Sequence, residues 1–133
     1  MPRFRPRVAA LVAAGAALAL AVPAALAASS PSETLKDHKI VGPASVKSGV
    51  VTFKVENTAD GLHELVVIKT PTKAAKLKTK NGRASEAGSL GEVEVKGGAS
   101  KTLKLTLKPG HYVLLCNVGE HYKAGMYKDF TVT

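Results

Sequence analysis

The amino-acid sequence predicts an all-β fold, a sandwich or barrel of short strands. Apolar and polar residues alternate with a period of two over residues 51–56 and 102–108, as they do in strands with one buried and one wet face. The 12 glycines and seven prolines suit a chain with many turns. A length of 133 residues corresponds to one domain, which excludes a barrel enzyme or a complete doubly wound domain.

The N-terminus differs from the rest of the chain. Residues 1–7 carry three arginines and no acid, residues 8–28 carry no charge, and Ala25-Leu26-Ala27 is a small-x-small cleavage pattern. These three regions predict a secretory signal peptide over 1–27, cleaved after Ala27 or within two residues of it. A retained membrane helix is the alternative, because the uncharged run is long enough to span a bilayer. We expect a short flexible leader at 28–35 and the folded domain at 36–133.

The expected strands follow the leader in order. Continuous apolar runs suit central strands that are buried on both faces, and several short strands separated by turns favour an antiparallel arrangement. Only residues 71–89 break the pattern, and we expect a surface insertion there with one helical turn around 74–77. The expected strands are 40–46 (interrupted by Gly42-Pro43), 51–56, 62–68, 92–96, 102–108, 112–116 and 129–133, of which 62–68 and 112–116 are the apolar runs.

The chain is basic, with 19 Lys and Arg against 10 Asp and Glu. Loss of the signal peptide removes three arginines and leaves a net charge of +6. The lysines are spread over strands and the insertion without interleaved aromatic residues. This distribution favours solvated lysine faces over a nucleic-acid site, so we expect no nucleic-acid partner.

One short stretch gathers the residues that suggest chemistry. Once the signal peptide is removed, the single cysteine, Cys116, and the single methionine, Met126, lie within eleven residues, and His121 is five residues from each. Taken alone, each residue would be a buried hydrophobe, core filler or a solvated loop residue. In an exported protein, however, a free thiol needs protection from oxidation. Together the three residues therefore predict a metal site.

A fourth ligand must come from elsewhere in the fold. His63 begins a predicted buried strand directly after a glycine-containing turn, where an imidazole can be aimed rigidly. His111 opens the strand that ends in Cys116, and at about 3.3 Å per residue the two lie more than 15 Å apart. His38 lies in a polar segment and is expected to be solvated. We therefore predict His63 as the fourth ligand.

Two imidazoles, a thiolate and a thioether define which metal fits. This donor set favours one copper ion, because sulfur ligands suit Cu(I) and imidazole suits both copper oxidation states. Zinc would leave the methionine without a role, and iron–sulfur or haem sites would need other ligands. A single cysteine also excludes an internal disulfide.

The pattern of His63 followed, after a long gap, by Cys-x₄-His-x₄-Met resembles the cupredoxins, the small type 1 blue copper proteins. The loop spacing is most similar to rusticyanin-like and sulfocyanin-like members, and the resemblance covers about residues 40–132. It implies a Greek-key β-sandwich of seven to eight strands with copper at one end. It also implies that His63 and His121 bind through nitrogen, Cys116 through its thiolate and Met126 as a weak axial ligand.

One residue departs from the family pattern. Many cupredoxins have an asparagine after the first histidine, where this chain has Glu64. An ionised carboxylate accepts hydrogen bonds but cannot donate them. Either Glu64 faces away from the site or the surroundings of the ligands are built differently, with Asn117 supplying part of the bracing.

These observations predict a monomeric one-electron carrier that exchanges electrons with a donor and an acceptor redox protein. The positive charge suits an acidic partner, and contact with a membrane surface is also compatible with it. No acid–base pair or activated nucleophile stands out, so we expect no enzyme. Copper trafficking or sequestration is the alternative, although the chain lacks Met-rich or His-rich tracts. A metal-free adhesion domain would leave the Cys–His–Met coincidence unexplained.

Overall fold

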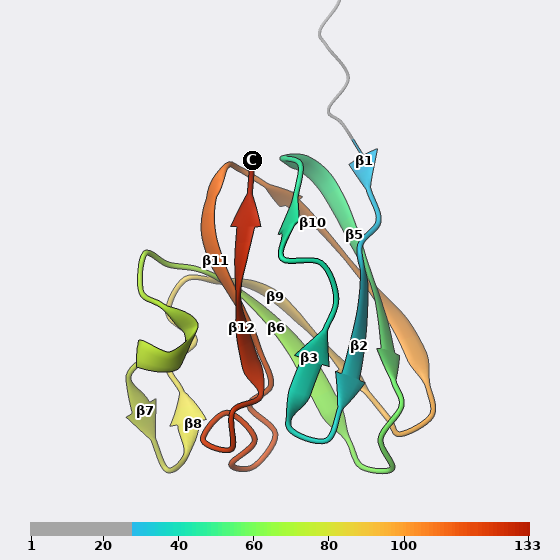
Figure 1. The fold of residues 1–133 in the computed structure, drawn as a ribbon, viewed down its shortest axis with the longest axis vertical. Coiled ribbons are helices and arrows are strands. Elements are labelled where there is room, and N and C mark those ends of the chain that lie inside the picture. Colours follow the sequence, from blue (N-terminus) through green and yellow to red (C-terminus); the bar gives the residue numbers. More distant parts are fainter. Residues whose placement is uncertain (1–27) are drawn as a thin grey trace, which may run out of the picture.

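Two β-sheets packed face to face form residues 28–133, the part of the chain that the computed structural model describes (Figure 1). The predicted all-β sandwich is confirmed. The predicted signal peptide, 1–27, lies outside the described residues, so its cleavage stays a prediction. Over the described range, no helix has the length and apolar character needed to cross a membrane.

The first sheet is centred on the longest strand, β5. This strand pairs with β10 in antiparallel fashion and with β1 and β2 in parallel fashion, and β3 completes the sheet beside β2. The five strands are β1 (Ala28–Ser29), β2 (Ser32–Lys36), β3 (Lys39–Val41), β5 (Gly49–Asn57) and β10 (Ser100–Leu107).

The second sheet carries the functional end of the molecule. Its order is β4-β12-β11-β6-β9, and β11 lies in the middle, antiparallel to both β12 and β6. The short strand β4 runs parallel to β12 at the edge. The bounds are β4 (Ser45–Val46), β6 (His63–Lys69), β9 (Ser89–Val95), β11 (Gly110–Leu115) and β12 (Tyr127–Val132).

The predicted strand over 40–46 is interrupted where Gly42 and Pro43 stand. A Cβ at Gly42 would collide with the Glu33 carboxylate and the Ser32 carbonyl, and Pro43 has no N–H to donate to a ladder. The chain therefore leaves the first sheet as β3 and enters the second as β4. β1 and β2 can be counted as one interrupted strand, and so can β3 and β4. Counted in this way, the sandwich of residues 28–133 has eight strands, in agreement with the expected seven to eight.

The main core lies between the sheets, because the inward residues of each alternating strand meet there. Phe53 from the first sheet and Phe130 from the second pack with ring centroids 5.7 Å apart. Each buried aliphatic side chain in such a core contributes about 1.5–3 kcal/mol. Other fully buried members are Leu35, Val51, Val55, Leu65, Val67, Val95, Leu107, Tyr112 and Leu114.

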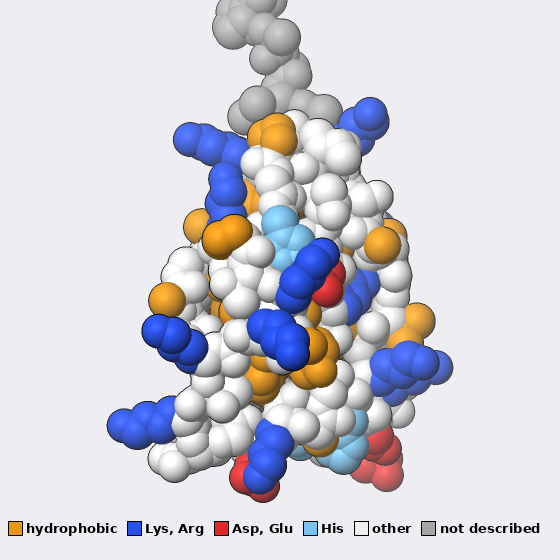
Figure 2. All heavy atoms as spheres, turned by 60° about the vertical axis from the view of Figure 1, so that its left-hand side comes forward, with side chains coloured by type: hydrophobic (Ala, Val, Ile, Leu, Met, Phe, Trp, Pro, Cys, Tyr) orange, Lys and Arg blue, Asp and Glu red, His pale blue; other side chains and the backbone are white. Residues whose placement is uncertain are grey.

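The insertion, residues 71–89, covers the outer face of the second sheet and faces the viewer in Figure 2. A second apolar cluster is buried beneath it, which explains why β6 and β11 are apolar on both faces. The insertion contains η1 (Ala74–Lys76), a 3₁₀ turn where a helical turn was predicted, and a hairpin of β7 (Thr79–Lys80) and β8 (Arg83–Ala84). The cluster comprises Val66, Ile68, Ala74, Ala84, Val113, Leu115 and Tyr122.

The flexible leader predicted for residues 28–35 is wrong, because this segment forms β1 and most of β2. Leu35 is fully buried, and Glu33 is only 1% exposed. The Glu33 Oε2 accepts a hydrogen bond from Lys128 Nζ at 2.7 Å, which compensates for the burial of the carboxylate. The two inward residues of β2 are Leu35 and Glu33, and Glu33 is a carboxylate paired with Lys128. The sequence therefore lacks the alternation of apolar residues that would predict a buried strand here. Most strand pairs are antiparallel, as expected, but β1 and β2 run parallel to β5 and β4 runs parallel to β12.

Candidate metal centre

Two adjacent strands bring His63 and Cys116 to the same end of the second sheet. His63 is the first residue of β6, and Cys116 follows the last residue of β11. The strands are antiparallel with Leu115 opposite Val66, so the end of β11 lies beside the start of β6. Both side chains are buried, with His63 2% exposed and Cys116 fully enclosed.

The loop after Cys116 returns His121 to the same place. The Cys116 N–H donates to the Met126 carbonyl and the Met126 N–H to the His121 carbonyl, both at 3.0 Å. These bonds close the loop into a compact set of turns. Gly119 and Gly125 adopt φ values of 51° and 103°, the region that favours glycine.

Three candidate ligand atoms form a small triangle. His63 Nδ1 and His121 Nδ1 are 3.1 Å apart, and Cys116 Sγ lies 3.8 Å from the first and 3.5 Å from the second. One point in the plane of this triangle lies about 2.0 Å from all three atoms. Metal–nitrogen bonds in proteins are about 2.0–2.1 Å and metal–thiolate bonds about 2.3 Å, so the triangle has the size that a metal ion requires.

Met126 lies beside this triangle. Its side chain is fully buried and belongs to the same core cluster as Cys116. The structure thus brings the four sequence-predicted residues to one end of the sandwich. His121 is the one among them that is partly exposed.

Burial sets the protonation of the three ligand side chains when no metal is bound. Burial, reinforced by the neighbouring His121, lowers the pKa of His63, and burial with the neighbouring His38 lowers the pKa of His121. Both imidazoles are therefore held neutral, which is the form that binds metals. Burial raises the pKa of the Cys116 thiol, although the Glu64 and Val118 N–H groups oppose the shift.

Glu64 faces the ligand loop, so the bracing differs from the expected asparagine. Its Oε1 accepts the Asn117 N–H at 2.9 Å, and its own N–H points at Cys116 Sγ at 3.4 Å. Burial raises the pKa of Glu64, and the hydrogen bond from Asn117 counteracts part of that shift. The carboxylate thus accepts from the residue after the cysteine instead of donating to the loop.

Asn117 connects the ligand loop to the insertion. Its Oδ1 accepts the Ala84 N–H at 2.8 Å, and its Nδ2 donates to the Ala84 carbonyl at 2.9 Å and to Glu86 Oε1 at 2.8 Å. The predicted bracing role of Asn117 therefore involves β8, an element that sequence analysis treated only as surface.

The remaining histidines occupy different positions. His111 lies near the far end of β11, where its ring contacts the Thr70 carbonyl and Asp129 Oδ1, so it takes no part in the centre. His38 is exposed, as predicted, but its ring packs edge-on against His121 with centroids 5.3 Å apart. Asp37 Oδ1 lies 3.9 Å from His63 Nε2. The turn between β2 and β3 therefore borders the centre, which sequence analysis missed because it assigned the preceding residues to a leader.

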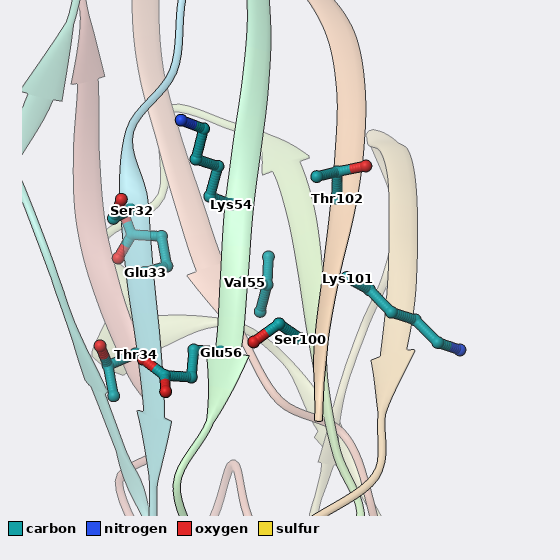
Figure 3. A pocket seen from close by; sticks show the side chains of 9 residues that line it. All are labelled: Ser32, Glu33, Thr34, Lys54, Val55, Glu56, Ser100, Lys101 and Thr102. Carbon is teal, nitrogen blue, oxygen red and sulfur yellow. The ribbon is translucent and has the colours of Figure 1, made fainter. Parts of the chain in front are cut away.

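A pocket of about 390 Å³ lies away from this centre, on the first sheet between β2, β5 and β10 (Figure 3). Its wall offers neither a thiol nor an imidazole, and none of the four predicted ligands contributes to it. The pocket therefore adds nothing to the metal chemistry. It is lined by Ser32, Glu33, Thr34, Lys54, Val55, Glu56, Ser100, Lys101 and Thr102.

Solved structures resemble this arrangement. An auracyanin of Roseiflexus castenholzii shares 21% identity over 82% of this chain and 98% of its own, with a TM-score of 0.60. Auracyanin A of Chloroflexus aurantiacus, described as a "blue" copper protein, shares 16% over 77% of this chain and 99% of its own, with a TM-score of 0.55. Rusticyanin of Thiobacillus ferrooxidans shares 12% over 78% of this chain and 76% of its own, with a TM-score of 0.63.

The chain has the cupredoxin fold. At these identities the likeness establishes the architecture. No protein-family model and no curated protein matches the sequence.

Within this cupredoxin fold, the donor set is chemically selective. Two neutral imidazoles and one enclosed cysteine in a trigonal array, with a thioether nearby, match the preference of copper for mixed nitrogen and soft sulfur ligands. Among residues 28–133, His63, Cys116 and His121 are the cluster of potential ligands whose donor atoms lie within 4.8 Å of one another.

Proposed function

We propose that this protein is an exported type 1 copper protein that carries one electron at a time between redox proteins. His63 Nδ1, Cys116 Sγ and His121 Nδ1 would hold the metal, and the Met126 thioether would be a weaker fourth ligand. The observation that carries the proposal is the buried triangle of donor atoms with the size of a metal site. Bound copper supplies a one-electron couple between Cu(I) and Cu(II).

The chain's own residues account for rapid exchange of that electron. Strand ends and backbone hydrogen bonds hold His63, Cys116 and His121 in place, so little rearrangement accompanies a change of oxidation state. Burial of three of the four side chains excludes water from the metal. The partly exposed ring of His121 gives a partner its closest approach to the centre.

The absorption spectrum of the oxidised, copper-loaded protein tests this proposal. We expect an intense visible thiolate-to-copper band with one copper per chain. Cys116→Ala should abolish the band, and Cys116→Ser should nearly abolish it, because the thiolate is the chromophore. Wild-type protein that binds copper without colour would instead support copper trafficking, and a blue Cys116→Ala variant would contradict the ligand assignment.

A further inference from the structure

The positive charge of the folded part is concentrated in the insertion. Residues 71–89 carry five basic side chains and one acidic side chain, a net charge of +4, whereas the net charge of residues 28–133 is +6. The other 87 residues therefore contribute only +2. All five basic side chains are exposed, and Figure 2 shows Lys and Arg spread over this face with few acidic groups between them. The five are Lys73, Lys76, Lys78, Lys80 and Arg83.

This basic insertion is attached directly to the loop that carries His121. The Asn117 side chain bonds to Ala84, and the Tyr122 hydroxyl donates to the Ala74 carbonyl. Gly82 lies so close to the loop that an added Cβ would meet the Glu120 side chain at 2.7 Å. The insertion and the ligand loop therefore form one continuous, rigidly connected surface.

A polar pocket of about 410 Å³ marks the seam between the two elements. Ala75, Thr79 and Gly82 line it from the insertion, and Lys123 lines it from the ligand loop. Lys123 is two residues from His121, and its Nζ lies 3.6 Å from Glu120 Oε1, so the ligand loop itself adds no net charge beside the basic insertion. A partner held by the insertion would thus also touch the element that presents His121.

We propose that the basic insertion is the docking surface for an acidic redox protein, and that it orients this partner toward His121. This inference rests on the proposed electron-carrier function. In each productive encounter one electron moves between the copper and the one-electron centre of the partner, so one is oxidised as the other is reduced. No proton and no covalent bond changes place.

Two features of the insertion favour an acidic protein over other anionic partners. Membrane-surface binding combines basic residues with apolar side chains that enter the lipid, but the exposed large apolar residues of the described chain, Val41, Leu62 and Leu90, lie outside the insertion. Single-stranded nucleic acid requires exposed aromatic rings for stacking. Of the two tyrosines that line the pocket, Tyr122 is buried, and Tyr127 is only partly exposed and packs against the Tyr122 ring with centroids 4.9 Å apart.

The test compares substitutions of lysines in the insertion with substitutions of lysines on the first sheet. Screening limits charge effects to about 8 Å at physiological ionic strength, so local charges orient a partner while distant ones only add to its overall attraction. We compare two triple variants of the exported, copper-loaded protein with the same change in net charge. One is Lys76→Glu, Lys78→Glu, Lys80→Glu in the insertion. The matched control is Lys54→Glu, Lys101→Glu, Lys104→Glu, three exposed lysines on the first sheet.

The probe is a reduced plant-type ferredoxin, used as an acidic one-electron donor, and the measurement is the second-order rate of electron transfer against ionic strength. At an ionic strength near 0.1 M, where screening acts over about 10 Å, the insertion variant should be slower than wild type by about tenfold or more, and the control variant by a clearly smaller factor. The difference should vanish at high salt. Equal slowing of both variants, or no slowing of either, would overturn the docking surface.

Two further readouts separate this inference from the proposed function. Reduction of both variants by ascorbate and their visible spectra should match those of wild type, because the copper ligands are unchanged. A wild-type protein that takes up no electron from ascorbate would contradict the carrier function itself. Sedimentation with phosphatidylserine vesicles should not distinguish the variants. Vesicle binding that is lost only in the insertion variant, with unchanged ferredoxin rates, would assign the surface to a membrane and overturn the proposal.

Discussion

The side chain of Cys116 has the protection that a lone thiol in an oxidising compartment requires. It is enclosed by the core, faces two neutral imidazoles and lies 3.4 Å from the Glu64 N–H. A hydrogen bond of this kind stabilises negative charge on sulfur, and bonding around the cysteine sulfur tunes the potential of copper–thiolate sites. With copper bound, this hydrogen bond from the Glu64 N–H would tune the charge on the Cys116 sulfur.

Met126 should tune the reduction potential more than it holds the metal, because an axial thioether is a weak ligand. Met126→Leu removes a donor that partly stabilises Cu(II), so the potential should rise. Met126→Gln supplies a harder oxygen, so the potential should fall. Each tenfold change in the relative affinity for the two oxidation states shifts a one-electron potential by about 59 mV. Voltammetry measures this, and equal potentials for both variants would show that Met126 is not axial.

Three of the four histidines should respond differently to substitution. His63→Ala removes one corner of the donor triangle and should degrade the copper spectrum. His111→Ala should leave the spectrum unchanged, because its ring bonds to Asp129 at 2.7 Å near the other end of β11. His38→Ala should also retain the colour, since its ring packs on His121 without pointing a donor atom into the triangle. Loss of copper in His38→Ala with retention in His63→Ala would reverse the assignment.

The ligand residues were accessible from sequence because their types are rare in this chain. The cysteine and the single methionine of residues 28–133 lie around a histidine, a pattern that does not depend on the fold. Asp37 and His38, by contrast, are ordinary residues of a polar segment, and their types do not mark them as neighbours of the centre. They border the centre only because β2 pairs with β5 and places its following turn there, and no local pattern reports that pairing.

Among the elements, the insertion supports the surroundings of the centre although it carries none of the four candidate ligands. It supplies the buried partners of Asn117, covers the outer face of β6 and β11, and contributes Ala74 and Ala84 to the second apolar cluster. The sequence predicts the position and the turn of the insertion but not this role. The apolar residues of the insertion are mainly alanines, which produce no clear hydrophobic period. The strands β6 and β11 are apolar on both faces, however, which indicates that another segment must cover their outer face.

Asn117→Ala should lower the free energy of unfolding by about 2 kcal/mol, because it leaves the buried N–H and carbonyl of Ala84 without their partners. Denaturant unfolding of the metal-free protein measures this effect. Amide exchange at β7 and β8 should accelerate in the same variant. Thr72→Ala, an exposed position in the same insertion, serves as the control and should change stability by less than about 0.5 kcal/mol. An Asn117→Ala variant as stable as this control would show that the connection to β8 is not needed.

For the molecule as a whole, the two sheets are joined at one edge by a partly buried ion pair. Lys128 of β12 reaches across to Glu33 of β2 and also donates to the Pro43 carbonyl at 2.8 Å. Burial raises the pKa of Glu33, while the hydrogen bond and charge of Lys128 oppose that shift without cancelling it. The folded state therefore holds a proton on Glu33 more tightly than the unfolded state does.

This raised pKa predicts a direction for the dependence of stability on pH. The stabilising contribution of protonated Glu33 is fully present below its ordinary pKa of 4.5 and is lost as pH rises through the folded-state value. The free energy of unfolding of wild type, relative to Glu33→Gln, should therefore fall as pH rises above 4.5. Denaturant titrations across this range test it, with the exposed Glu56→Gln as control. A rising difference would mean that Lys128 dominates over burial.

The sandwich could be predicted because most strands have one solvent-facing side, so apolar and polar residues alternate along them. Its eight strands are six long ones and two interrupted ones. The parallel pairing of β2 with β5 was not predictable in the same way. Strand direction within a sheet depends on which segments meet across the fold, and the polar composition of residues 28–35 conceals that they form strands at all. The pairing of β2 with β5, in which Glu33 lies opposite Val55, shows that these residues belong to the first sheet.

Both ends of the described chain emerge at the pole opposite the donor triangle. Ala28 pairs with Val50 at the beginning of β5, and Val132 pairs with Gly110 at the beginning of β11, whereas Cys116 follows the other end of β11 (Figure 1). An affinity tag, fusion domain or lipid tether joined at either terminus would leave the redox pole facing outward. Immobilisation through a terminus would accordingly keep soluble partners reactive. Direct exchange with the supporting surface would be slow, because electrons would have to cross the length of the sandwich.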